Sequence, residues 1–315
     1  MTLLASHSAT GSSRDAAIAP LVSVCICTFR RPQVAKAVLS IFEQQDLGNA
    51  PFEVLVCDDD PNASAAPLFE RLCAAAPLLR YVISGAGNVA IARNTCLAAA
   101  RGALIAFIDD DQVADPRWLS TLLRAQAAHR AHVVKGHVRG IYPPDTPEWV
   151  KAADPFTRDY GPTGSRLSEG GTGNVLFVRD LYAHHGLVFD PAFGIGGGED
   201  SDFFRRATAL GAVMISCREA VVDEIVPPYR VGRPYLVDKA LRYGETAGRS
   251  SRLGDVERGR ALDEFARALA GVSLGWIYPA LRPMRTASAY RVMVKFWYSV
   301  GVLRGLLGSS VRRMA

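Results

Sequence analysis

The first third of the chain alternates between short apolar runs and longer stretches in which apolar residues recur every three or four positions. Unbroken runs rich in Val, Ile, Leu and Cys are typical of strands that are buried on both faces. The amphipathic stretches between them are typical of helices. The pattern predicts strands over 21–28, 52–57, 79–83 and 103–108, and helices over 32–45, 67–76 and 90–101, the last capped by Gly102.

Strands and helices that alternate in this way predict an α/β fold, with an open sheet flanked by helices. The second half of the chain is less regular. A segment rich in Gly, Pro and Asp, which we call the flap (140–173), is expected to be a long ordered loop. After the flap we expect a strand over 173–178, a Gly-rich segment over 193–202, a helix over 201–210 and a strand over 212–216.

The formal net charge of +5 is unevenly distributed along the chain. From Val231 onward there are 15 Lys and Arg against 6 Asp and Glu, and no acidic residue follows Glu264. Residues 1–20 are rich in Ser and Ala and lack the features of a signal peptide, so we expect a disordered leader. We therefore divide the chain into this leader, an α/β domain (21–230) and a basic helical appendage (231–315).

Near the end of the appendage, apolar residues follow a helical stripe with basic residues beside it. The stripe consists of Val292, Phe296, Val300, Leu303 and Leu307. Such a helix can lie on an anionic membrane surface, so 265–315 is a candidate membrane contact. The alternative is a helix packed on the α/β domain. Because the six cysteines form no zinc-like pairs, we expect reduced thiols in a cytoplasmic protein, peripheral on the cytoplasmic face of the inner membrane.

Polar residues follow three of the predicted strands at the point where each strand ends. These segments are Thr28-Phe29-Arg30, Asp58-Asp59 and Asp109-Asp110-Asp111. Ligands of open α/β sheets bind at the carboxyl ends of the strands. We therefore expect the three groups to meet at one edge of the sheet.

The acidic cluster that follows the fourth strand is a candidate metal site. If the strand continued through it, Asp109 and Asp111 would share a face and Asp110 would lie opposite. Two adjacent carboxylates repel each other unless a cation neutralises them, and oxygen ligands suit Mg²⁺ or Mn²⁺. The alternative is a solvated acidic turn.

Asp59 and Arg93 are two further candidates on the same edge. A carboxylate at the end of the second strand can accept a hydrogen bond from a base or a ribose hydroxyl, although Asp-Asp-Asp-Pro is also a common turn sequence. Arg93 lies early in the third predicted helix, where it could brace the acidic groups or meet a diphosphate. The alternative for Arg93 is an exposed side chain.

Glu199 and Asp200 follow a Gly-rich segment and begin a predicted helix. Glycines allow the backbone to approach a ligand closely. A carboxylate at this place could act as a general base, taking a proton from an acceptor hydroxyl. The alternative is that both acids only cap the helix.

In their order along the chain, these motifs resemble the inverting glycosyltransferases of family two, which have the GT-A fold. Within that family, the flap, Gly171-Thr-Gly-Asn174 and Glu224-Ile-Val-Pro-Pro-Tyr-Arg230 are similar to bacterial exopolysaccharide sugar transferases of the succinoglycan type. The motifs that carry the family resemblance are Val22–Pro32, Val56–Asp60, Asn88–Asn94, Phe107–Asp111 and Gly197–Asp200.

The resemblance implies a role for each matching residue. Thr28, Phe29 and Arg30 would line a nucleotide pocket, Asp59 would meet the uracil or ribose, and Arg93 would lie near the diphosphate. The Asp-x-Asp motif would be Asp109 to Asp111, with Asp111 as the direct metal ligand and with Asp109 and Asp110 also at the donor. Asp200 would be the catalytic base and Glu199 would help to shape the site. The appendage would reach a glycan or polyprenyl-linked acceptor.

One feature departs from the family pattern. Many relatives place a His after the last strand as a further metal ligand, whereas this chain has Glu224. Two other functions remain open from the residues alone. A nucleotidyltransferase that makes sugar nucleotides also uses an open sheet and bound metal, but it begins with a Gly-rich phosphate loop that is absent after the first strand. A nucleic-acid binder could use the basic tail, but the body is net acidic and we expect no nucleic-acid partner.

Overall fold

The computed structural model describes most of the chain, and the predicted leader lies outside the described residues. The side chains of 252 and 258–264 are also outside the description. The described residues are 21–44, 46–47, 50–194, 196–252, 258–273, 280 and 286–308.

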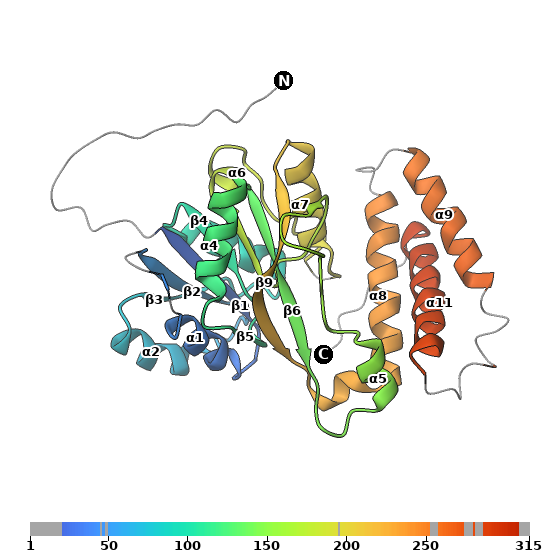
Figure 1. Cartoon of the computed structure of the whole chain (residues 1–315), viewed down its shortest axis with the longest axis horizontal. Coiled ribbons are helices and arrows are strands. Elements are labelled where there is room, and N and C mark those ends of the chain that lie inside the picture. The colour runs from blue at the N-terminus through green and yellow to red at the C-terminus, as the bar shows by residue number, and fades with distance from the viewer. Residues whose placement is uncertain are drawn as a thin grey trace.

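The described residues form one mixed nine-stranded sheet (Figure 1), in the order β3-β2-β1-β4-β8-β6-β9-β5, with β7 paired to β9. The first four strands of this order are parallel, and β8 joins β4 and β6 in antiparallel pairs. The strands are β1 (Val22–Thr28), β2 (Phe52–Asp58), β3 (Leu79–Ile83), β4 (Leu104–Phe107), β5 (Gln112–Ala114), β6 (Val133–Ile141), β7 (Arg166–Leu167), β8 (Val175–Val178) and β9 (Met214–Ile225).

Helices cover both faces of the sheet. One core contains Val24 and Ile26 of β1 with residues of α1 and α4, and the other contains Cys25 of β1 with residues of α3 and α7. Because successive β1 side chains point to opposite cores, most positions of the strand are apolar. The helices of the domain are α1 (Val34–Phe42), α2 (Ala66–Ala75), α3 (Val89–Ala99), α4 (Trp118–His129), α5 (Glu148–Ala153), α6 (Asp180–Ala183) and α7 (Glu199–Ala209), followed by the 3₁₀ turn η1 (Pro228–Val231).

The sequence predicts the first six elements closely, but it omits some elements and is wrong in two details. α4 and β6 are absent from the prediction, and β6 runs into the start of the predicted flap. The last strand of the domain reaches Ile225 instead of ending at 216, because β6 pairs with it as far as Ile141. Gly102 does not cap α3, which ends at Ala99. Its backbone N–H instead donates to Ser23 Oγ at 2.8 Å, and a side chain there would clash with β1.

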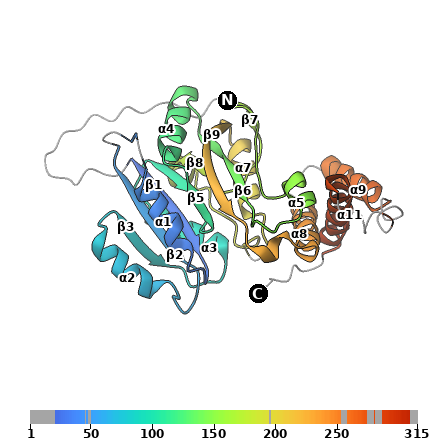
Figure 2. The same cartoon turned by 60° about the horizontal axis from the view of Figure 1, so that its bottom comes forward.

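The C-terminal region forms α8 (Arg233–Arg252), α9 (Arg258–Val272) and α11 (Ala287–Leu306), which gather at one end of the molecule (Figure 2). Glycines bring the backbones of α8 and α11 into close contact, since a Cβ on Gly301 would clash with the Leu241 carbonyl. The buried face of α11 includes Met293 and Val302. The stripe predicted for this helix is therefore not its packing face: Leu307, for example, is 87 % exposed. No helix among the described residues is long and apolar enough to cross a membrane.

Candidate active site

The ends of β1, β2 and β4 bring the predicted polar groups together. β1 lies between the other two strands, with Thr28 opposite Asp58. The Thr28 hydroxyl donates to Asp110 Oδ2 at 2.8 Å, and the Asp59 N–H donates to the Thr28 carbonyl at 2.9 Å. The three strand ends therefore meet at one edge, as the sequence predicts.

The loop after β1 and the end of β2 form the side of the site predicted to hold the nucleotide. Arg30 has a positive φ of 56°, and its guanidinium forms two hydrogen bonds with Asp60, at 3.1 and 3.2 Å. The same guanidinium lies 4.9 Å from the centre of the Phe29 ring. Asp59 is buried and accepts a hydrogen bond from Ser84 Oγ at 2.9 Å. This side therefore offers an aromatic ring, a cation and an anchored carboxylate.

The three aspartates of the acidic cluster do not follow the alternation of a strand. β4 ends at Phe107, and the Gln112 N–H donates to the Asp109 carbonyl at 3.1 Å, which closes a turn. Asp110 and Asp111 share a partner because Arg31 Nη1 lies 2.8 and 3.0 Å from their carboxylates. The prediction that Asp109 and Asp111 share a face with Asp110 opposite is therefore wrong, because the chain turns before the cluster.

Arginines from distant segments surround the end of the cluster. Arg230 on η1 lies 3.0 Å from Asp111 Oδ2 and 3.6 Å from Glu224 Oε1. Glu224 is opposite Gln112 in the pairing of β5 and β9, and it accepts a hydrogen bond from Arg158 of the flap at 2.7 Å. The residue at the position of the family's His is thus buried in an arginine network. Arg31 lies in the motif Val22–Pro32 and Arg230 ends the motif that begins at Glu224, whereas no sequence pattern indicates Arg158.

The charges around Asp109 bear on whether a cation fits this site. Burial raises the pKa of Asp109, and the neighbouring charge of Asp111 raises it further. A hard cation between two carboxylates would relieve that repulsion, so the donor chemistry of Asp109 and Asp111 fits Mg²⁺ or Mn²⁺. No cluster of three or more His, Cys, Asp or Glu suited to a metal occurs in the described part of the chain. Such an ion would therefore need phosphate oxygens or water as its remaining ligands.

Arg93 is buried and pairs with Glu199, so it is not the exposed side chain of the alternative interpretation. It projects from α3 and lies 5.7 Å from the centre of the Phe189 ring. Burial lowers the pKa of Arg93, but the charges of Glu199, Asp200 and Asp109 outweigh burial and raise it. Burial raises the pKa of Glu199, and the positive charge of Arg93 partly offsets this rise. The pair links α3 to the start of α7, next to Asp200.

Asp200 lies in the first turn of α7, where the helix dipole favours a negative charge. Its carboxylate accepts from the Ser201 N–H at 2.7 Å, and the Thr172 N–H lies 3.4 Å away. Together with Asp109 and Arg93, it lines a polar cavity of about 560 Å³. The other lining residues are Arg158, Tyr160, 166–173, Ser201 and Tyr243.

A buried lysine that the sequence did not single out supports the wall of this cavity. Lys135 on β6 is fully buried, and its ammonium donates to the carbonyls of Gly171, Gly173 (3.3 Å) and Asn174 (3.2 Å). Asn174 has a positive φ of 67°, and its side chain bonds to Trp118, His137 and Ala220. The Gly-Thr-Gly-Asn motif is thus fixed from two sides.

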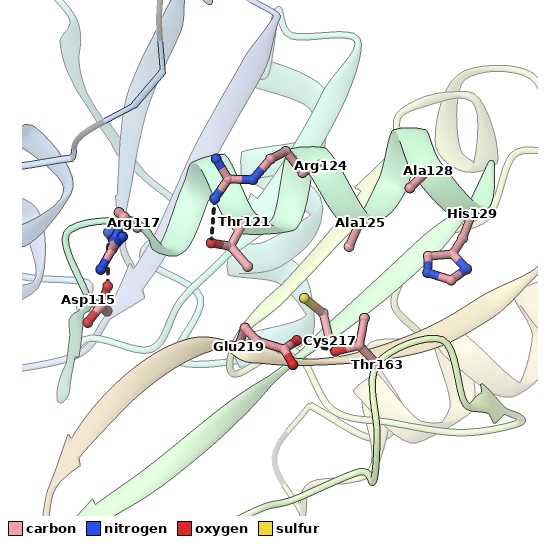
Figure 3. A pocket seen from close by; sticks show the side chains of 10 residues that line it. All are labelled: Asp115, Arg117, Thr121, Arg124, Ala125, Ala128, His129, Thr163, Cys217 and Glu219. Carbon is pink, nitrogen blue, oxygen red and sulfur yellow. Dashed lines mark hydrogen bonds between the residues drawn. The ribbon is translucent and has the colours of Figure 1, made fainter.

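A second cavity, of about 590 Å³, lies between α4, β9 and the turn that contains Thr163 (Figure 3). Cys217 and Glu219 of β9 line one side, and Arg124 of α4 lines the other. None of the predicted site residues lines it. Of the predicted site residues, Arg93, Asp109 and Asp200 line the cavity beside α7, and the others do not.

Comparisons with known proteins identify the family and the fold. The model of "Glycosyl transferase family 2" matches residues 23–186. The chain is 32 % identical over 291 residues to the succinoglycan biosynthesis protein ExoM of Rhizobium meliloti (strain 1021), covering 91 % of this chain and 93 % of that protein.

Solved structures with the same fold include residues 1–349 of S. aureus TarS. Its complex with UDP has a TM-score of 0.51 at 17 % identity, and its complex with UDP-GlcNAc has a TM-score of 0.52 at 16 % identity. Each match covers 92 % of this chain and 93 % of the TarS chain. The fold is GT-A, and the glycosyltransferase interpretation prevails over the nucleotidyltransferase and the nucleic-acid binder. The chain belongs to glycosyl transferase family 2 and is a glycosyltransferase.

Proposed function

We propose that the protein moves a sugar from a UDP-linked donor, with inversion, to a glycan or lipid-linked glycan acceptor in exopolysaccharide biosynthesis. The likeness to a succinoglycan biosynthesis protein supports the pathway. The UDP and UDP-GlcNAc complexes of TarS, which share the fold, support the class of donor.

The observation that carries the proposal is the shared cavity of Asp109, Arg93 and Asp200. Asp200 takes the proton of an acceptor hydroxyl while that oxygen attacks the anomeric carbon. A bond forms from the acceptor oxygen to this carbon as the bond from the carbon to the diphosphate oxygen breaks. A single displacement inverts the anomeric configuration. Glu199, held by Arg93, shapes the wall beside the base.

The donor would lie across the strand ends. Phe29, Arg30 and Asp59 would contact the nucleotide, and Asp110, which accepts a hydrogen bond from Thr28, would lie beside them. The negative charge of the diphosphate would be attracted by the guanidinium groups of Arg93 and of Arg31 and Arg230, which lie beside Asp111. These assignments follow the resemblance to family two glycosyltransferases.

The proposal includes a divalent cation, Mn²⁺ or Mg²⁺, held by Asp109 and Asp111. When bound, such an ion stabilises negative charge on a leaving diphosphate. Its test has a readout apart from turnover: MnCl₂ should raise the melting temperature of the wild type but not of Asp111→Asn. Asp145→Asn, on an exposed part of the flap, is the matched control. Equal shifts in all three proteins would remove the metal from the proposal.

Asp200→Asn tests the role of the base because the amide keeps the shape of the carboxylate but cannot accept the proton. We expect UDP release in the presence of acceptor to fall by at least about 100-fold, within the usual contribution of a general base. UDP binding, measured by calorimetry, should stay within about twofold of wild type. Asp180→Asn, on α6, serves as the control. Near-normal turnover of Asp200→Asn would exclude Asp200 as the base.

We also propose that the C-terminal region brings the enzyme to the cytoplasmic face of the inner membrane. Phe265 and Leu269 of α9 are exposed, as is Leu307. Arg291 and Lys295 of α11 are exposed as well. Exposed apolar and basic side chains together favour contact with an anionic surface.

A further inference from the structure

Two aromatic residues that line the active-site cavity come from segments away from the strand ends. Tyr160 belongs to the flap, and Tyr243 belongs to α8 in the C-terminal region. We infer that these two tyrosines form an acceptor subsite for the terminal pyranose ring of a glycan chain. The inference rests on the proposed function, because it takes Asp200 as the base that the acceptor hydroxyl must reach.

α8 is fixed against the flap one turn before Tyr243. Lys239 Nζ donates to the Pro155 carbonyl at 2.9 Å and lies 3.9 Å from the centre of the Phe156 ring. Phe156 also stacks on Tyr235, with ring centres 6.3 Å apart. The backbone position of Tyr243 is therefore set by packing on both of these flap residues.

The following turns of α8 hold the segment that presents the base. Thr246 Oγ1 donates to the carbonyls of Gly196 and Gly197, at 3.2 and 3.3 Å. Arg249 Nη2 lies 3.2 Å from the Gly197 carbonyl. Because α7 begins at Glu199, α8 contacts the flap on one side of Tyr243 and the segment before Asp200 on the other. Tyr243 thus occupies a rigid place between the flap and the base.

The chemistry of this wall fits a sugar. Tyr243 is 58 % exposed, so its ring is not part of a packed core and offers an apolar surface with a polar tip. A pyranose has apolar C–H faces that pack on such a ring and hydroxyls around its edge. Arg158, Arg166 and Glu169 line the same cavity and supply donors and acceptors for those hydroxyls. A few polar groups around an apolar platform are typical of small-ligand sites.

The position also separates acceptor from donor. Of the residues proposed to hold the donor, Arg93 and Asp109 line this cavity together with Asp200, whereas Phe29 and Asp59 do not, so the cavity adjoins the diphosphate end of the donor and not the nucleobase. A base must lie within hydrogen-bond reach of the hydroxyl that it deprotonates. The acceptor ring therefore enters between Asp200 and the two tyrosines.

The test compares Tyr243→Ala and Tyr243→Phe, with Leu78→Ala, at an exposed position just before β3, as the control. A panel of p-nitrophenyl α- and β-pyranosides serves as acceptors, with UDP release measured at saturating UDP-sugar. Tyr243→Ala should raise the acceptor KM about 3- to 10-fold, the range of one lost aromatic contact, and leave the donor KM unchanged. Tyr243→Phe, which keeps the ring, should change the acceptor KM less than twofold, and Tyr160→Ala should behave like Tyr243→Ala.

Binding provides a second readout that needs no turnover. Saturation-transfer NMR on the UDP-bound protein should show pyranoside C–H signals that are lost in Tyr243→Ala and kept in Tyr243→Phe. An unchanged acceptor KM in Tyr243→Ala would overturn the subsite, as would equal rises in the donor and acceptor KM. A panel in which no pyranoside binds or reacts would overturn the class of acceptor. These failures differ from failure of the proposed function, which would appear as normal turnover in Asp200→Asn or as absence of UDP binding.

Discussion

Thr28, Asp59 and Asp110 could be assigned to one site from the sequence because each follows the end of a buried strand. Parallel neighbours carry such ends to the same edge of a sheet. Arg158 and Arg230 could not be assigned in this way. Their partners, Glu224 and Asp111, lie 66 and 119 residues away in the chain, and only the pairing of β6 with β9 and the turn η1 bring them close. Local patterns thus predict the floor of the site but not its arginine network.

Lys135 is a second residue whose role depends on tertiary structure. Burial lowers the pKa of its ammonium to about 7, with Arg158 adding to the effect and Asp200 and Asp109 opposing it. In the unfolded chain the group titrates near 10.5. Between these two pH values the unfolded state binds more protons than the folded state. The contribution of Lys135 therefore makes the free energy of unfolding rise with pH through this window.

Lys135→Met should remove this part of the pH dependence. A full difference of one proton corresponds to about 1.4 kcal/mol per pH unit, which is the upper limit for the lost slope. Denaturant unfolding at pH 7, 8 and 9 measures it, with Lys151→Met on α5 as a control in which the lysine is only partly buried. Identical slopes in wild type and Lys135→Met would show that the buried ammonium is not linked to stability.

At the scale of elements, the sequence predicts those whose pattern is local. The run Val22–Thr28 is apolar except at Ser23 and Thr28 because both faces of β1 are buried, and this pattern is clear in the sequence. α4 is absent from the sequence prediction, and its buried face includes the polar Ser120 among Trp118, Leu119, Leu122 and Ala125. The start of α7 depends on both local and distant residues. The Gly-rich segment before it is visible in the sequence. The contact of Gly198, which has a φ of 100°, with Thr246 of α8 is visible only in the structure.

Gly198→Ala should therefore impair catalysis more than an ordinary glycine substitution. The left-handed conformation costs a residue with a Cβ about 1–2 kcal/mol, and here the new methyl would also clash with Thr246 Cγ2. Gly211→Ala is the matched control, since Gly211 has a φ of 90° but open space around its Cβ. Both variants should lose stability in thermal unfolding, Gly198→Ala more than Gly211→Ala because of the clash, whereas only Gly198→Ala should lose most of its turnover. Gly198→Ala/Thr246→Ser should recover part of it, and a control that loses as much turnover would contradict the packing argument.

At the scale of the whole molecule, the C-terminal helices contact the active-site segments and also expose a basic surface. α8 contacts the flap and the segment before the base, so the region beyond Val231 is joined to the active site. α11 packs on α8 through close backbone contacts at Gly244 and Gly301. The sequence offered packing and membrane contact as alternatives, but they are compatible, because α11 packs through one face and exposes basic side chains on another.

The membrane proposal therefore predicts that charge on α11 controls binding to vesicles without affecting the fold. Arg291→Gln/Lys295→Gln removes two exposed cations from this helix. Each basic residue near an anionic surface contributes about 1 kcal/mol, so the double variant should bind phosphatidylglycerol vesicles roughly 30-fold more weakly at low salt.

Arg117→Gln/Arg124→Gln on α4, beside the cavity of Figure 3, makes the same change in net charge at a different surface. If net charge alone governed binding, both double variants would weaken flotation equally. A loss confined to the α11 variant, and suppressed for wild type at high salt, would assign the contact to the C-terminal helices. Failure of the wild type to float at low salt would leave α11 with a packing role alone.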